Sequence, residues 1–350
     1  MTIIAAAALS VMPMAVEAHD FTVAVKGNVL YFSITDTVKP SVTLTYEGSI
    51  AEGNSYSISG EIELPAMVRY GDTMFAVTAI SPKAFSGATA LTSVIIPSTV
   101  RTIGDFAFEG CSSLQKIVFP GKDVTFGQGV FFKCTSIRDI SFGSDWHSIN
   151  LEAYRWSDSL RSVRIPAKVT KLLNMKSLTQ LEEIDVDANN GRFSSSGGIL
   201  YNKDGTVLYG VPRSYKGTVR IKEGTTTVTP GALIDCKLVT RIDIAASVTS
   251  MSFREASRME QLQEIIFRSK EPMTTAYTAA DSLLLLQVAN ADVMLTVAKD
   301  SKKAYSGRLC VTAGEYAESK ETGSLAYPVS ENQLPNVKNI NAVKDIDNYE

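Results

Sequence analysis

The sequence has few of the side chains on which metal sites, disulfide scaffolds and many catalytic sites depend. Its 350 residues include 4 cysteines, 2 histidines and 2 tryptophans. Four cysteines are too few to staple a chain of this length, and none are spaced as Cys-x-x-Cys, so we expect no disulfide scaffold and no bound metal. Of the histidines, His19 lies near the N-terminus and His147 in a connection without a nucleophile-elbow motif. We therefore expect no cofactor and no enzyme; the alternative is an enzyme that uses His147.

Basic tracts and long apolar runs are also missing beyond the N-terminus. The net charge is −3, with no basic cluster, which argues against nucleic-acid binding. Residues 1–18 form an apolar run that ends in the small-x-small pattern Val16-Glu17-Ala18, although no basic residue precedes Lys26. This run fits a signal peptide better than a transmembrane segment. We expect export and no transmembrane segment; the alternative is an ordinary N-terminal helix.

A repeated apolar pattern fills the middle of the chain. The key residue recurs every 23 positions at Leu91, Leu114, Ile137 and Leu160, then at Leu181 after a shorter copy, and again at Val239 and Leu262. Each copy continues as Leu-x-x-Ile-x-Phe, and a fixed period of this length is typical of leucine-rich repeats. One such coil cannot bury its own apolar side, but stacked coils form a continuous core. The pattern predicts a repeat solenoid with one strand of a parallel sheet and one short helical turn per coil.

The clearest copy is Ala107-Phe108-Glu109-Gly110-Cys111-Ser112-Ser113-Leu114, preceded by Ile103 and followed by Val118-Phe119-Pro120. This order resembles the BspA-like leucine-rich repeats of bacterial surface proteins, and the resemblance covers about residues 60–269. It implies a secreted, periplasmic or surface-attached bacterial protein, often adhesive.

The period also suggests how the chain is divided. We predict a signal peptide over 1–18, an N-terminal β cap over 19–75, the repeats over 76–270 with a hairpin insertion over 194–212, and a C-terminal cap and tail over 271–350. The insertion is expected because Ile199-Leu200-Tyr201 and Thr206-Val207-Leu208-Tyr209 flank a turn whose Gly205 allows a positive φ.

In each Leu-x-x-Ile-x-Phe segment, the third and fifth residues should face solvent. Residues of both charge signs and a few apolar ones occupy these positions, which suits lateral pairing between coils and protein recognition. Our candidate binding face consists of Ile95, Lys116, Val118, Asp139, Arg164, Glu183 and Asp185. Ile95 and Val118 have an alternative role in packing under the N-terminal region. In later copies the same positions hold Arg241, Asp243, Glu264 and Ile266.

Two further groups of residues have competing interpretations. Trp146, Tyr154 and Trp156 could stack on a sugar ring, but they also fit core positions of the repeat. Cys111, Cys134 and Cys236 share one repeat position with Ala88 and Met259, which indicates a buried apolar slot with free thiols. The alternative is a disulfide between Cys111 and Cys134.

Together these features predict an exported, non-enzymatic protein, a monomer that binds a protein or extracellular-matrix ligand of a host or neighbouring cell. The alternatives are a carbohydrate-binding module, with a glycan as partner, and a purely structural envelope protein.

Overall fold

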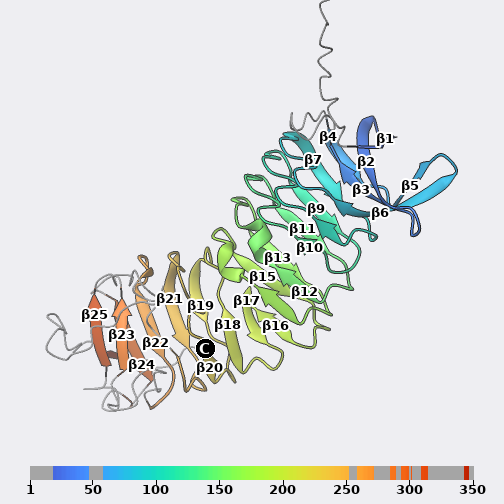
Figure 1. The fold of residues 1–350 in the computed structure, drawn as a ribbon. Helices are drawn as coiled ribbons and strands as arrows, with labels where there is room; N and C mark the ends of the chain where they lie inside the picture. The colour runs from blue at the N-terminus through green and yellow to red at the C-terminus, as the bar shows by residue number, and fades with distance from the viewer. Residues whose placement is uncertain are drawn as a thin grey trace, which may run out of the picture. The chain divides into compact units, whose positions relative to one another are not determined.

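The structure is a computed structural model, and it describes residues 19–46, 58–251, 258–271, 284–288, 293–298, 301, 309–313 and 343–346. The predicted signal peptide lies outside the described residues. The chain divides into two compact units. The first unit comprises Met1–Leu114 and Val124–Cys134, and the second comprises Gln115–Asp123 and Thr135–Glu350. Strands dominate both units (Figure 1).

The first unit begins with antiparallel strands and changes to parallel pairing. Strands β1 (Phe21–Val25), β2 (Asn28–Asp36) and β3 (Ser41–Thr45) form an antiparallel meander, and β5 (Met67–Tyr70) pairs antiparallel with β6 (Thr73–Ile80). From β3 the sheet continues in parallel through β6, β8 (Thr102–Ile103) and β10 (Thr125–Phe126). A second parallel pair joins β4 (Ser59–Glu63) to β7 (Ala90–Ile95). The N-terminal strands therefore form the β region that precedes the repeats.

The second unit contains most of the repeats as parallel pairs. These are β9 (Lys116–Phe119) with β11 (Asp139–Phe142), β12 (Ser148–Asn150) with β14 (Lys171–Leu173), and β13 (Ser162–Ile165) with β15 (Glu183–Val186). Further along, β19 (Gly217–Arg220), β21 (Val239–Ile244), β22 (Glu264–Phe267), β24 (Met294–Ala298) and β26 (Val343–Ile346) form one parallel sheet. Strands β23 (Leu284–Val288) and β25 (Leu309–Ala313) form another pair.

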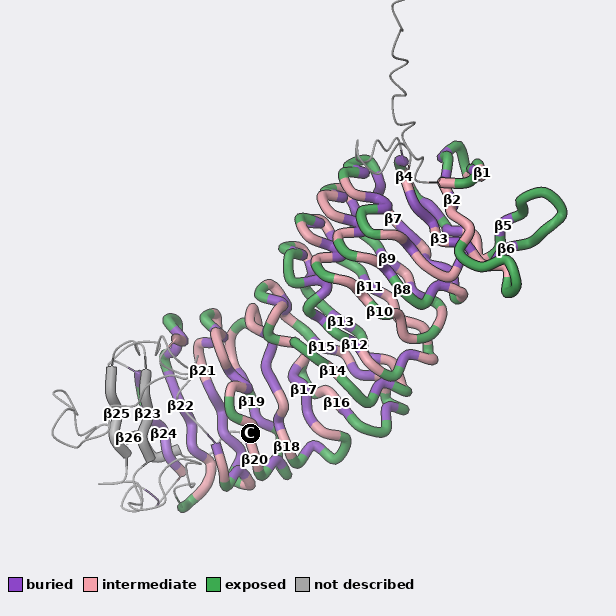
Figure 2. Tube along the Cα trace, in the orientation of Figure 1, coloured by how far each residue is buried: buried purple, intermediate pink, exposed green. Residues whose placement is uncertain are grey.

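The strand register reproduces the repeat period. Ile117 lies opposite Ile140 and Phe119 opposite Phe142, each 23 residues on, while Arg164 lies opposite Asp185, because that copy is shorter. The key apolar positions of the repeat are buried in both units (Figure 2). These parallel strands form a leucine-rich repeat fold, as the 23-residue spacing predicted.

The short helical turn predicted in each coil is not helical in most copies. The two helices that the structure describes in full are η1 (Leu151–Tyr154) and η2 (Met175–Ser177), and both are 3-10. In the other coils the chain makes turns closed by bonds to the third residue back, such as Ala88 N–H to the Phe85 carbonyl at 3.1 Å. Positive φ angles at Lys83 and Gly87 interrupt any helical run.

The reason lies in bonds between coils. The N–H of Phe85 donates to the carbonyl of Ala107 at 2.6 Å, and that of Phe108 donates to the carbonyl of Val130 at 2.9 Å. These donors are therefore not available for bonds within a helix. In the core beneath these turns, the rings of Phe85 and Phe108 stack with their centroids 4.8 Å apart. The stacking of coils, rather than local helix propensity, determines this conformation.

The insertion is a three-stranded antiparallel sheet in the second unit. Strands β17 (Ile199–Asn202) and β18 (Val207–Gly210) pair antiparallel, and Gly205 in the turn has φ of +74°. Strand β16 (Phe193–Ser196), which the sequence did not suggest, pairs with the other edge of β17. Strand β18 then pairs in parallel with β20 (Thr227–Val228), which returns the chain to the repeat ladder.

Candidate functional site

The candidate binding face lies along the strands whose inner residues form the core. Lys116, Asp139, Arg164 and Glu183 are exposed, and Ile95, Val118 and Asp185 are half-buried. Alternation along the strands explains this pattern, because neighbouring residues such as Ile117 and Val163 point into the core and are buried. No ligand or partner identifies this face as a binding site, so its role stays a prediction.

Charges on this face pair between adjacent strands, as their alternation along the repeats predicted. Lys116 lies 3.8 Å from the carboxylate of Asp139, and Arg164 lies 3.0 Å from that of Asp185 and 3.5 Å from that of Asp187. Bonds from the Asn189 backbone and from Arg164 hold the pKa of the Asp187 carboxyl below its usual value. Exposed pairs of this kind stabilise a fold by less than about 1 kcal/mol each. They leave the charges accessible to a partner.

The later strands differ from this expectation, because three of their four outward positions are buried and only Arg241 is half-buried. Asp243 is 3 % exposed and Glu264 is 5 % exposed. The carboxylate of Asp243 accepts two bonds from Arg268, at 2.6 and 2.8 Å, and that of Glu264 accepts a bond from Thr296 at 2.6 Å and lies 2.7 Å from Arg241. Ile266 is 2 % exposed. On β21 and β22, the predicted outward face is therefore accessible mainly at Arg241.

A groove divides the exposed part of the face. Strands β11 and β13 belong to separate sheets, and a cavity of about 480 Å³ lies beside them. Asp139 and Arg164, both on the candidate face, line it together with Arg138, Ser141, Ser162 and Asp187. The groove presents both charge signs and three hydroxyl groups, because Ser144 lines it as well. The sequence pattern gave no sign of it, because the 23-residue period runs through this point without interruption.

The aromatic cluster proposed for glycan stacking packs largely inside the protein. Trp146 is 1 % exposed and Tyr154 is 0 % exposed, while Trp156 is 45 % exposed. The ring of Phe142 lies 4.8 Å from that of Trp146 and 6.4 Å from that of Tyr154. Burial also raises the pKa of the Tyr154 hydroxyl. The glycan interpretation is wrong for Trp146 and Tyr154, because core packing covers both rings, and Trp156 alone does not form a stacking cluster.

The repeat cysteines occupy the buried slot predicted from Ala88 and Met259. Cys111, Cys134 and Cys236 are free thiols with 0 % exposure. The Sγ atom of Cys111 donates to the Phe85 carbonyl at 3.1 Å, one coil back. The hydrogen bond with Cys134 and burial raise the pKa of the Cys111 thiol far above its usual value. The side chain of Cys310 lies outside the described residues.

His147 lies in an exposed loop rather than in a cleft. Its Nδ1 atom is 4.0 Å from the carboxylate of Asp123, and its backbone N–H donates to the same carboxylate at 2.6 Å. Asp123 therefore organises the loop as a backbone acceptor. Within the part of the chain that the structure describes, no three His, Cys, Asp or Glu side chains gather as a metal site requires.

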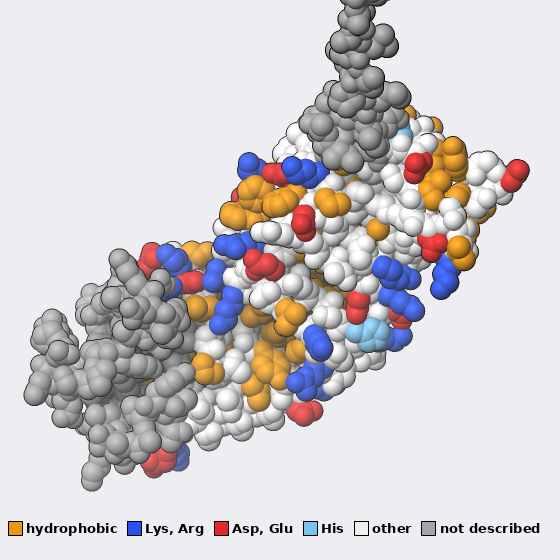
Figure 3. All heavy atoms as spheres, in the orientation of Figure 1, with side chains coloured by type: hydrophobic (Ala, Val, Ile, Leu, Met, Phe, Trp, Pro, Cys, Tyr) orange, Lys and Arg blue, Asp and Glu red, His pale blue; other side chains and the backbone are white. Residues whose placement is uncertain are grey.

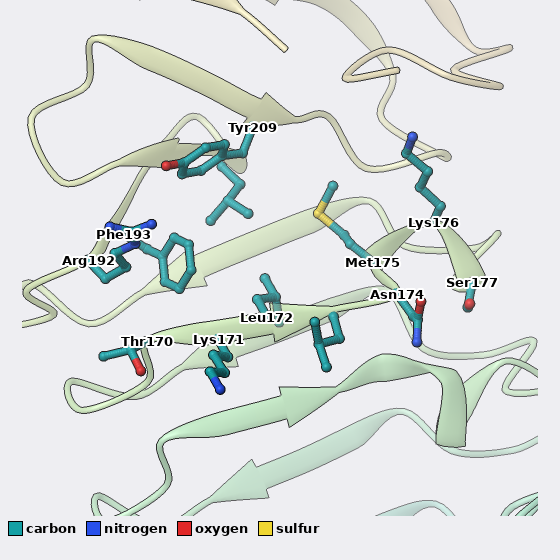
Figure 4. Close-up of a pocket in the computed structure, with 12 residues that line it drawn as sticks. Thr170, Lys171, Leu172, Asn174, Met175, Lys176, Ser177, Arg192, Phe193 and Tyr209 are labelled. Carbon is teal, nitrogen blue, oxygen red and sulfur yellow. The ribbon is translucent and has the colours of Figure 1, made fainter. Parts of the chain in front are cut away.

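A second cavity, which the sequence did not indicate, lies between β14 and the insertion (Figure 4). Its volume is about 510 Å³. Its wall comes from β14, η2 and strands β16 to β18, and includes Leu172, Met175, Phe193, Leu200 and Tyr209. The only sequence signal nearby is the interruption of the repeat period by the insertion.

Parallel strands with a regular spacing of buried apolar residues are typical of a leucine-rich repeat fold. Residues 73–195 match the family model described as BspA type leucine rich repeat region, in six copies. Residues 73–195 are therefore a BspA-type leucine-rich repeat region, as the order of residues from Ala107 to Leu114 predicted.

Solved structures with similarity to the chain include three bacterial proteins. A leucine rich cell surface protein from Faecalibacterium prausnitzii is 18% identical, with 80% of this chain and 88% of that chain covered and a TM-score of 0.37. The pneumococcal vaccine antigen PcpA is 16% identical, with 85% and 99% covered and a TM-score of 0.42. A leucine-rich repeat protein from Bacteroides ovatus is 18% identical, with 80% and 85% covered and a TM-score of 0.42. No curated protein matches the chain.

Proposed function

We propose that this chain is an exported, non-enzymatic protein of the bacterial surface, and that it binds a protein or extracellular-matrix ligand through the exposed face of β9, β11, β13 and β15. Its repeats would form a solenoid closed by the N-terminal strands and by a C-terminal cap. The BspA-type repeat region supports the surface assignment. None of the helices in the described residues is long and apolar enough to cross a bilayer.

The observation that carries the proposal is the groove beside β11 and β13. A partner can only lie against the surface of a flat sheet, whereas a cavity of about 480 Å³ can enclose one or two of its side chains. Arg164 at its wall is 68 % exposed in its side chain and is held by two carboxylates. An arginine with a fixed orientation and an accessible guanidinium suits recognition of a carboxylate or a backbone carbonyl.

The direct experiment is a binding screen of the full chain against purified extracellular-matrix proteins and a glycan array, followed by charge reversal. Arg164→Glu is expected to weaken binding to a protein ligand by about tenfold or more, and Lys116→Glu by less, because Lys116 lies outside the groove. The matched control is Arg155→Glu, an exposed arginine directly after η1 that forms an ion pair with Glu152 and lies outside the groove. Unchanged affinity in Arg164→Glu would count against the sheet face.

Export is tested separately. Surface biotinylation of intact cells should label the chain, and the mass of the mature protein should correspond to cleavage after Ala18. A cytoplasmic protein with an intact N-terminus would contradict this part of the proposal and leave the binding experiment unaffected.

A further inference from the structure

The repeat ladder is interrupted between β14 and the insertion. Strand β14 pairs with β12, and with no other strand among those the structure describes. The N–H groups of Thr170 and Lys171 both donate to the carbonyl of His147, on the β12 side. Strand β16 likewise pairs only with β17. The free edge of β14 therefore borders the cavity of about 510 Å³ described above.

Apolar surface is left uncovered at this interruption. Ile149 on β12 is 1 % exposed, but Leu172, one coil later at the same repeat position, is only half-buried. Phe193 and Tyr209, with ring centroids 6.0 Å apart, lie across the cavity from it (Figure 4). Met175 closes the side opposite Phe193. Leu172 thus occupies a core position that lacks the next coil which would cover it.

The charges around this cavity have one sign. Lys171, Lys176 and Arg192 line it, no acidic side chain does, and none of the three cations forms an ion pair with a described residue. The carboxylate of Glu152 accepts a bond from the lining residue Ser177, and it pairs with Arg155 at 3.2 Å. In Figure 4, Arg192 lies beside Phe193, and Lys176 lies beyond Met175. Hydrophobic and basic side chains lie together over β14 and β16 on the surface drawn in Figure 3.

We propose that this cleft binds an extended acidic peptide segment, which adds a strand to the free edge of β14 and inserts a large apolar side chain between Leu172 and Phe193. A strand edge provides main-chain hydrogen bonds, and a neighbouring pocket selects side chains. The uncompensated Lys176 and Arg192 favour carboxylates flanking the inserted side chain. This site is separate from the groove at β11 and β13.

The test uses the full chain and fluorescence anisotropy with a labelled short peptide in which Leu and Phe alternate with Glu. Two comparison peptides replace Glu by Lys, or the apolar residues by Ser. The Glu-containing apolar peptide should bind, and both comparison peptides should bind at least about tenfold more weakly at low salt. Equal binding of all three peptides would overturn the proposal.

Two variants with the same net charge locate the site. Lys176→Glu combined with Arg192→Glu should weaken binding by about tenfold or more. Lys39→Glu combined with Lys222→Glu, two exposed lysines outside the cleft, should change affinity by less than about twofold. Circular dichroism and the urea midpoint verify folding of both variants. A similar loss in both pairs would mean nonspecific electrostatic attraction and would overturn the site.

Strand addition has its own readout, which does not depend on any variant. Methylation of the backbone nitrogens of alternate peptide residues removes the N–H donors from one edge of the bound peptide strand and leaves those of the other edge intact. Methylation on one set should abolish binding, while methylation on the other should be tolerated. Equal effects of both sets would overturn strand pairing. Binding of dodecanoate without binding of the peptide would instead assign the cleft to a lipid-like anion, and the peptide proposal would be wrong.

Discussion

Asn190 is the residue whose substitution gives the most specific prediction. Its side chain is 0 % exposed and makes four hydrogen bonds. Its amide nitrogen donates to the carbonyls of Pro166 and Val169 at 2.7 and 3.0 Å. Its oxygen accepts from the N–H groups of Arg192 and Phe193 at 2.8 and 2.7 Å. Asn190 thereby joins the coil that follows β13 to the two residues at the edge of the peptide cleft proposed above.

Asn190→Asp keeps the shape of the side chain but removes both donors. The two bonds accepted from the backbone can remain, while the second oxygen now faces two carbonyl oxygens. The half-buried Pro166 carbonyl keeps the bond from the Val169 N–H at 3.3 Å but loses the bond from the amide, which costs about 1 kcal/mol. Leaving the buried Val169 carbonyl unpaired costs about 2 kcal/mol. Repulsion of an ionised carboxylate adds to these losses. We expect the free energy of unfolding at pH 7 to fall by about 3 to 5 kcal/mol.

This loss should depend on pH. Protonation of the new carboxyl restores one donor, so its pKa in the folded state is raised above the value in the unfolded state, about 3.9. The folded variant then holds a proton that the unfolded variant releases, and stability falls as the pH rises from about 4 toward the folded pKa. The slope is at most about 1.4 kcal/mol per pH unit. The loss relative to the natural chain should therefore shrink as the pH is lowered from 7 to 5.

The assay is urea unfolding followed by circular dichroism at pH 5 and pH 7. The matched control is Asn189→Asp, the same substitution at the exposed neighbouring position, which should change stability by less than about 0.5 kcal/mol at either pH. If Asn190→Asp were as stable as Asn189→Asp at pH 7, or if its deficit did not vary with pH, the assigned hydrogen bonds would be wrong.

Three further predictions concern the core. The buried repeat thiols should not react with Ellman's reagent at pH 8 in the folded chain and should react fully in denaturant. The reason is that the hydrogen bond with Cys134 and burial raise the pKa of Cys111. Rapid reaction of the folded chain would show that the reagent reaches the buried position. Burial raises the pKa of Tyr154 above its ordinary value of 10.0, so above that pH the unfolded state loses the proton first, and the free energy of unfolding should fall as pH rises further. Tyr154→Phe should make that fall shallower, which denaturation at pH 9 and 11 measures; an unchanged slope would mean that Tyr154 contributes nothing. Gly143→Ala would place a Cβ 2.5 Å from the Pro120 carbonyl oxygen and should cost about 2 kcal/mol in urea unfolding. Gly191→Ala, with no atom within 4 Å, is the control, and equal stability of the two variants would contradict the clash.

Part of the candidate face could be predicted because it depends only on the repeat and on strand alternation. The outward direction of Lys116 and Asp139 follows from the inward direction of Ile117 and Ile140, and their pairing follows from the 23-residue register. The buried slot of Cys111 was predictable because Ala88 and Met259 occupy it in other coils. In each case, the burial of a position in one coil predicts the burial of the same position in the next coil.

Other features could not be predicted, since they depend on contacts that the repeat does not encode. Asp243 and Glu264 occupy outward positions but are buried with arginine partners, one of them, Arg268, lying outside the repeat strand. The aromatic residues Trp146 and Tyr154 carried the same sequence signal for a sugar site as for a core, and only their packing around Phe142 distinguishes the two.

The sequence by itself determined the repeat class, the register and the identity of the inward residues, because apolar spacing alone dictates which side of each coil must be buried. The tertiary structure decided where the ladder is interrupted. The groove beside β11 and β13 and the cleft beside β14 both lie where neighbouring strands do not pair. Whether two adjacent coils meet depends on the volume of the side chains packed between them and on the path of the insertion, and neither is a property of the period.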